Sequence, residues 1–172
     1  DCHVVAAHGK QDFYNVRVYR NDPEIKWCSP IHNYLNVKGD TRCDAVITYG
    51  YSPAHAQDPG RARRILSKVV KENPDSVRER YYLAREHFYR REWEKVVEAL
   101  DEYLPRSVIV AERADAHLMK ARALWSLSRG EEAREACMKA ILNNANFKEA
   151  VLFMAELHFP KNAATWRKFA DH

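Results

Sequence analysis

The sequence EWEKVVEALDEYL, residues 92–104, places Val96, Leu100 and Tyr103 four and then three positions apart. This spacing puts the three apolar side chains on one face of an α-helix. The same pattern of small or apolar residues recurs 34 positions earlier and 37 positions later. The recurring positions are Ala62, Leu66, Val69, Ala133, Cys137 and Ala140. A pattern that returns at nearly constant intervals indicates a repeated structural unit.

A second set of positions repeats between these helices in the same register. Ala84 is followed by Ala121 after 37 residues and by Ala155 after a further 34. Both sets fit a 34-residue unit with one three-residue insertion near residues 105–113, where Pro105 breaks a helix. Over residues 59–172 the chain therefore resembles the tetratricopeptide-repeat proteins, in which helix pairs stack into a solenoid.

We expect a mainly α-helical solenoid over residues 58–172, with about three helix pairs after one leading helix. The predicted helices cover residues 59–73, 77–90, 93–104, 112–127, 131–143, 147–158 and 162–171. The alanines at positions 84, 121, 133 and 155 should be buried where helices approach closely. Because the array would start on the second helix of a pair, its first face needs a neighbour, and residues 1–57 are the candidate.

Residues 1–57 differ in character from the repeats. Strand-forming residues predict short β-strands at residues 15–21, 25–27 and 44–51. Three short strands with exposed edges would be poorly stable alone. We therefore interpret them as the last strands of a larger α/β sheet, and the start at Asp1 indicates that the chain is the back end of a longer protein.

Three stretches follow one another from residue 17 into the first predicted helix: RVYRNDPEIKWCSPIHNYL (17–35), VITYGYSP (46–53) and DPGRARRIL (58–66). In this order they resemble family 2 glycosyltransferases, in the subset whose GT-A catalytic domain runs directly into tetratricopeptide repeats. Residues 17–21 match a strand with the pattern Arg-x-apolar-Arg-Asn near the end of that domain. Ile31 and His32 match the first two positions of an apolar-His-Glu motif that follows it. Asn33 stands where the family usually has Glu, which puts any carboxylate role there in doubt.

The resemblance implies transfer of a sugar from a nucleotide-sugar donor to an acceptor, with Mn²⁺ or Mg²⁺ as cofactor in the full-length enzyme. His32 would be a metal ligand, or else a histidine that is merely hydrogen-bonded at a strand end. Arg17 or Arg20 would contact the diphosphate, but a spacing of three lets at most one of them face a given pocket. The alternative is that these arginines form surface or structural ion pairs. The metal-binding Asp-x-Asp motif and the catalytic carboxylate would lie upstream, so this fragment is not expected to be active alone.

The first helices of the pairs should line a groove that holds an acceptor or a protein partner. Aromatic residues and arginines recur there, and these residue types dominate binding hot spots. The predicted groove residues are Tyr81, Arg85, Phe88, Arg122 and Trp125, with Leu118, Leu152, Glu156 and Phe159 at equivalent positions. The alternative is that this row packs against the missing domain or against itself.

Charge, hydropathy and cysteine spacing argue against several classes of protein. The net charge of +4 is mild, and Arg61, Arg63 and Arg64 spread around a helix with no aromatic platform, which disfavours nucleic-acid binding. No apolar run approaches the roughly 20 residues that a membrane span needs. Four scattered cysteines without a CxxC pair argue against a zinc ribbon and favour a cytoplasmic location. We therefore expect a glycosyltransferase fragment, or alternatively a non-catalytic tetratricopeptide scaffold that binds proteins.

Overall fold

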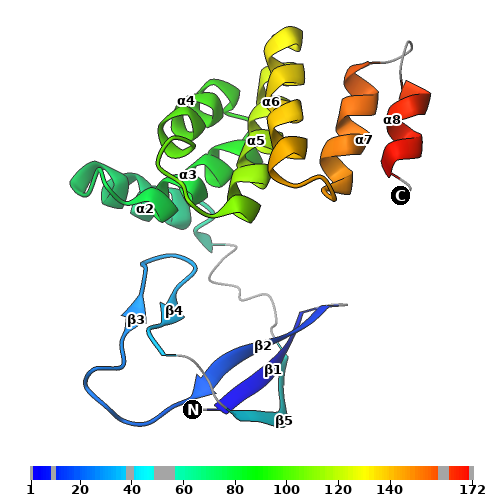
Figure 1. Ribbon diagram of the computed structural model, residues 1–172. Helices are drawn as coiled ribbons and strands as arrows, with labels where there is room; N and C mark the ends of the chain where they lie inside the picture. The colour runs from blue at the N-terminus through cyan, green and yellow to red at the C-terminus, as the bar shows by residue number, and fades with distance from the viewer. Residues whose placement is uncertain (1, 9–10, 38–40, 49–56, 159–162, 171–172) are drawn as a thin grey trace. The chain divides into compact units, whose positions relative to one another are not determined.

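The computed structural model describes residues 2–8, 11–37, 41–48, 57–158 and 163–170. The chain forms two compact units, Asp1–Ile65 and Leu66–His172. The first is built mostly from β-strands and the second from α-helices (Figure 1).

The first unit contains two separate sheets. Strands β1 (Cys2–His8), β2 (Gln11–Val18) and β5 (Thr41–Thr48) form a three-stranded sheet in the order β2-β1-β5. The central strand β1 pairs antiparallel with β2 and parallel with β5. Strands β3 (Trp27–Cys28) and β4 (Tyr34–Leu35) form a two-stranded antiparallel sheet of their own.

This arrangement corrects three sequence-based expectations. Strands β1 and β4 were not predicted, β2 ends at Val18 rather than at residue 21, and among the described residues β3 pairs with β4 in a sheet separate from β1, β2 and β5. The Asn36 side chain explains the separate pair, because its amide oxygen accepts from the Lys26 backbone nitrogen and its amide nitrogen donates to the Glu24 carbonyl, both at 2.8 Å. These bonds hold the two ends of the segment together.

The second unit is a series of helices that agrees with the predicted repeat. Within the described residues the helices are α2 (Arg61–Glu72), α3 (Val77–Tyr89), α4 (Trp93–Tyr103), α5 (Val110–Ser126), α6 (Gly130–Asn143), α7 (Lys148–Leu157) and α8 (Ala163–Ala170), and α2 spans the boundary between the units. Every boundary lies within two residues of its predicted position. The prediction of a mainly helical repeat fold is therefore confirmed.

Neighbouring helices pack through small residues. Helix α5 packs against α3, α4 and α6, and α7 packs against α6 and α8. Ala84, Ala121, Ala133 and Ala155 are each at most 1% exposed, which confirms their predicted burial. Larger side chains such as Leu100 fill the spaces between these contacts. The resulting core runs continuously from α3 to α8.

Two helix turns repeat the same backbone geometry 37 residues apart. Arg91, between α3 and α4, and Ser128, between α5 and α6, have positive φ angles of 58° and 61°. At each turn, two backbone N–H groups donate back to carbonyls in the last turn of the helix, as in a Schellman motif. The repeat therefore extends from the sequence to the turns that set the packing of each helix pair.

Polar side chains also connect successive helices. Arg80, which is almost fully buried on α3, pairs with Glu102 on α4 and donates to the Pro74 carbonyl. The Tyr103 hydroxyl accepts from Ser107 at 2.7 Å and donates to Glu112 of α5 at 3.0 Å. Among the described residues, no helix is both long and apolar enough to cross a membrane.

Candidate partner-binding groove

A groove opens between α3 and α5 on one face of the helical unit. Its volume is about 260 Å³, and we call it the α3–α5 groove. Helix α3 contributes side chains spaced four and then three or four residues apart, and α5 contributes a matching row, so each helix presents a single face. The lining residues are Tyr81, Arg85, Phe88 and Tyr89 of α3 and Asp115, Leu118, Met119 and Arg122 of α5.

The floor of the groove contains a hydrogen bond between the two helices. The Tyr81 hydroxyl donates to Asp115 Oδ2 at 2.6 Å. Tyr81 is only 6% exposed, and burial, reinforced by the bond to Asp115, raises the pKa of its phenol well above the ordinary value. Tyr81 therefore stays protonated and keeps donating to Asp115.

Tyrosine rings surround the Arg85 guanidinium. Its central carbon lies 5.9 Å from the ring centroids of Tyr81 and Tyr89 and 5.6 Å from that of Tyr82. Arg85 Nη2 also donates to the Tyr89 hydroxyl at 2.9 Å. Cation–π contacts of this kind hold the side chain in place without neutralising its charge.

Arg122 faces the groove from the other helix. Its guanidinium carbon lies 5.6 Å from the Phe153 ring centroid of α7, and the side chain is exposed. Within the described part of the chain, neither Arg122 nor Arg85 forms an ion pair. By contrast, Arg90, Arg129 and Arg134 each pair with a glutamate three or four residues away. The two groove arginines therefore keep hydrogen-bond donors for another molecule.

Comparison with solved structures finds several chains with this helical arrangement. A crystal structure of MamA matches with a TM-score of 0.53 and 16% identity, covering 70% of each chain. MamA 41-end from Desulfovibrio magneticus RS-1 matches with a TM-score of 0.55 and 18% identity over 69% of this chain and 63% of that one. A MamA AMB-1 structure matches with a TM-score of 0.59 and 17% identity over 69% and 66%.

The shared feature is a tetratricopeptide-type helical fold. At this level of identity the likeness shows the fold alone. No protein-family profile matches the chain, and no curated protein sequence matches it. The glycosyltransferase resemblance therefore rests on the sequence motifs of residues 17–66.

Four of the five predicted groove residues line the same groove: Tyr81, Arg85, Phe88 and Arg122. Trp125 does not line it. Its ring lies beside the start of α6, where a Cβ added at Gly130 would come within 3.5 Å of the indole. Leu152 and Glu156, at the equivalent positions of α7, are exposed, and Phe159 lies outside the described residues.

The predicted nucleotide-sugar and metal residues lie in the first unit. Arg17 is within β2, and Arg20 follows that strand with an exposed side chain. His32 is exposed in the turn between β3 and β4, with a positive φ of 50°. In the described parts of the chain, His32 does not join two other His, Cys, Asp or Glu side chains in a metal-binding arrangement. Its assignment as a metal ligand stays a prediction.

Sequence reasoning missed three residues of the groove: Tyr89, Asp115 and Met119. The signal for Asp115 was its helical spacing, because it lies three residues before Leu118, the repeat equivalent of Tyr81, on the same face of α5. Tyr89 follows the predicted Phe88 directly, and both side chains reach the groove from the last turn of α3.

Proposed function

We propose that this chain is a protein-interaction scaffold that holds an acidic segment of a partner in the α3–α5 groove. The supporting observation is that Arg85 and Arg122 face one groove and neither is ion-paired within the described residues. Arginine guanidinium groups bind carboxylates through paired, charge-assisted hydrogen bonds. Tyr89, which is 64% exposed, supplies apolar contact area beside the charges.

The positions of the arginines favour a peptide segment over a small ion. They lie on different helices, and the part-buried Phe88 and the exposed Tyr89 line the same groove. A ligand that contacts both must therefore cross the groove and cover part of this apolar surface. An acidic side chain flanked by apolar residues meets both requirements.

Peptide selection followed by a binding assay tests this proposal. Random twelve-residue peptides would be selected on the wild-type chain, and the winners measured by fluorescence polarisation. We expect peptides rich in Asp and Glu, with affinity reduced at least about 100-fold by Arg85→Ala/Arg122→Ala, since a hydrogen bond to a charged group contributes about 1.5–3 kcal/mol.

The matched control is Arg129→Ala/Arg134→Ala, which removes the same charge from α6, where both arginines are already ion-paired. This control should leave the affinity within about twofold, because exposed pairs contribute little. Equal losses in the two double variants would show that net charge, and not the groove, drives binding.

A second candidate keeps the first unit as the end of a GT-A domain. The observation that favours it is the parallel pairing of β1 with β5, which is typical of α/β domains. In that case Arg17 or Arg20 would contact the donor diphosphate, His32 would help hold the metal, and the groove would receive the acceptor. Transfer of sugar by the isolated chain would contradict this candidate, because its catalytic carboxylate and most of its donor site would lie upstream.

A further inference from the structure

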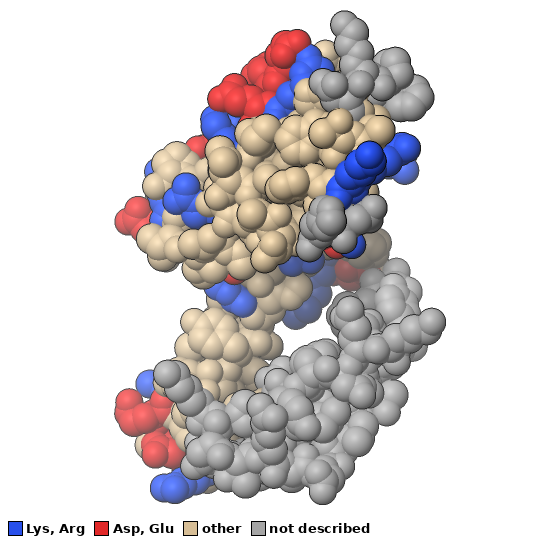
Figure 2. All heavy atoms as spheres, turned by 45° about the vertical axis from the view of Figure 1, so that its right-hand side comes forward, with Lys and Arg blue, Asp and Glu red and all other residues tan. Residues whose placement is uncertain are grey.

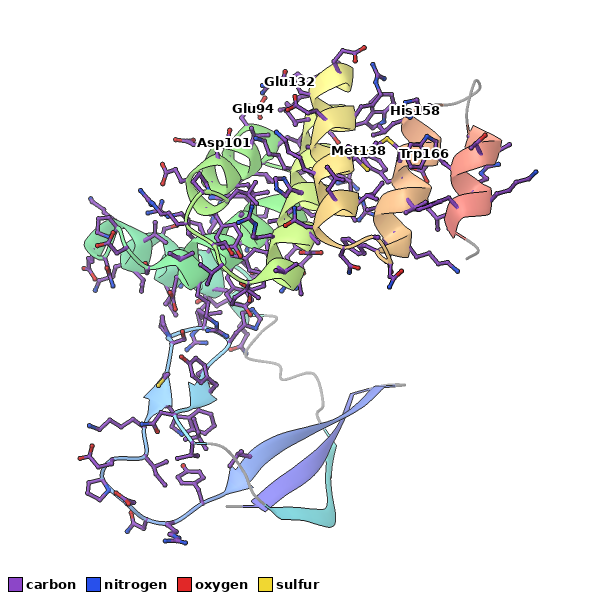
Figure 3. The ribbon with its side chains drawn as sticks, viewed as in Figure 1. Glu94, Asp101, Glu132, Met138, His158 and Trp166 are labelled. Atoms are coloured by element: carbon purple, nitrogen blue, oxygen red, sulfur yellow. The ribbon has the colours of Figure 1, made fainter. Side chains whose placement is uncertain are left out.

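A second cleft lies at the other end of the helical unit, between α6, α7 and α8. Its volume is about 480 Å³, and we call it the α6–α8 cleft. It shares no residue with the α3–α5 groove. The lining residues are Glu131, Glu132, Arg134, Glu135, Met138, Met154, His158 and Trp166. Figure 3 shows Met138, His158 and Trp166 close together where α6 faces α7 and α8.

Aromatic and sulfur-containing side chains form one wall of this cleft. The Trp166 ring lies 6.0 Å from the His158 ring, with an angle of 32° between their planes, and Phe169 meets Trp166 edge-on at 6.4 Å. These contacts hold the indole in place. The face of an indole ring attracts cations more strongly than any other side-chain ring.

The hydrogen-bonding groups of the cleft are mostly acceptors. His158 Nδ1 lies 3.0 Å from the Met154 carbonyl oxygen. A carbonyl oxygen can only accept, so Nδ1 carries the hydrogen and Nε2 of the neutral ring is an acceptor. The three glutamate carboxylates also accept only. Arg134 and the indole N–H of Trp166 are the donor-only groups among the lining residues.

The glutamates can exchange their present partners. Glu131, Glu132 and Glu135 pair with Arg134, Arg129 and Lys139, all on or next to α6 and three or four residues away. Figure 2 shows a group of acidic side chains at one end of the helical unit with basic side chains at its border. Exposed pairs of this kind contribute little stability, so a cation of a partner can replace them.

We infer that the α6–α8 cleft binds an arginine side chain in a basic segment of a partner protein. The guanidinium would stack on Trp166 and donate to the glutamates, while its aliphatic stem contacts Met138 and Met154. Charge complementarity supports this assignment, because three carboxylates line the cleft and their partners Arg134, Arg129 and Lys139 are held by exposed pairs that another cation can replace. This assignment does not depend on the function proposed for the α3–α5 groove.

The three methionines of the chain allow a direct test. Met138 and Met154 line the cleft, whereas Met119 lines the groove. N-acetylarginine methylamide would be titrated into the ¹³C-methyl-methionine-labelled chain, with the neutral citrulline analogue as matched probe. We expect saturable shifts of the Met138 and Met154 methyl resonances with the arginine probe only, and no shift of Met119.

Two double variants locate the binding groups. Glu131→Gln/Glu135→Gln should lower the affinity of the arginine probe at least about fivefold, because charge-assisted hydrogen bonds become neutral ones. Glu94→Gln/Glu98→Gln removes the same charge from exposed positions of α4 outside the cleft and should have no effect. Equal shifts with citrulline, equal weakening by both variants, or shifts that follow self-association of the chain would overturn the inference.

Discussion

The α3–α5 groove and the α6–α8 cleft are built from the same kind of helix but offer opposite chemistry. The groove presents two arginines among tyrosine rings, whereas the cleft presents three glutamates beside a tryptophan and a histidine. Both lie on a common core of small and aliphatic residues. The repeat therefore determines where a surface forms, while the charged residues that stand at each surface determine what it binds.

The largest expected effect tests whether both surfaces depend on one core. Leu124 of α5 is 1% exposed within that core. Leu124→Ala should lower the free energy of unfolding by about 2–5 kcal/mol, because it removes buried methyl groups and leaves a cavity. Urea denaturation followed by circular dichroism measures this change. A loss below about 1 kcal/mol would mean that α5 is not the shared support of the two surfaces.

A buried histidine behind both surfaces should make stability depend on pH. Burial lowers the pKa of His117 to about 4, with a further contribution from the nearby cations of Lys139, Arg113 and Lys120. Below pH 6.5, His117 binds a proton in the unfolded chain but stays neutral in the native chain until the pH nears 4. The free energy of unfolding therefore decreases as pH falls from 6.5 towards 4.

The variant His117→Leu removes this titration. Between pH 7 and pH 5 the wild type should lose about 1–2 kcal/mol more than the variant. Urea denaturation at both pH values gives the difference. Parallel losses in the two proteins would show that His117 is accessible to protons in the native state, and would weaken the description of the helix packing between groove and cleft.

A variant in the groove should change binding there without changing binding in the cleft. Tyr89→Phe removes the hydroxyl that accepts from Arg85 at 2.9 Å but keeps the ring. Affinity for a selected acidic peptide should fall by a factor of about 2–10, because Arg85 loses this anchor and must be ordered on binding, at about 0.5–1.5 kcal/mol per side chain. Fluorescence polarisation measures that loss, and the shifts caused by the arginine probe in the cleft serve as the control. If Tyr89→Phe lowered the affinities for the acidic peptide and for the arginine probe alike, the two surfaces would not be independent.

The smallest expected effect concerns the turn that joins a groove helix to a cleft helix. Ser128, between α5 and α6, has a φ of 61°, which glycine adopts without the steric cost of a Cβ. Ser128→Gly should therefore stabilise the chain by about 0.5–1 kcal/mol, after the greater freedom of glycine in the unfolded state is subtracted. Thermal denaturation measures the gain, and destabilisation would contradict the turn geometry.

The helices were predictable because a repeat supplies several independent copies of each boundary signal. Helix α6, for example, begins at Gly130 and ends at Asn143, against a predicted range of 131–143. Strand β1 was not predicted because CHVVAAH is a short run without alternation and has no repeated counterpart. Its place in the sheet depends on pairing with residues up to 41–48, which local patterns do not reveal.

The candidate sites likewise divide into residues that the repeat pattern predicts and residues that only tertiary packing brings together. Tyr81, Arg85, Phe88 and Arg122 were predictable because helical spacing and repeat register place them on one face. Trp125 has the same register but packs beside α6, since the indole is large enough to reach the Gly130 position. The α6–α8 cleft was not predicted at all. It combines residues of three helices, and Trp166 and His158 meet there only through the packing of α7 against α8.

The most direct test of the central claim is a methyl-resonance titration with an acidic peptide selected on the wild-type chain. Met119 lines the groove that contains Arg85 and Arg122, while Met138 and Met154 report on the cleft in the same spectrum. We predict saturable shifts of Met119 alone, and their loss in Arg85→Ala/Arg122→Ala. Shifts confined to Met138 and Met154, or a Met119 shift that persists without both arginines, would contradict the assignment of the α3–α5 groove as the site for acidic partners.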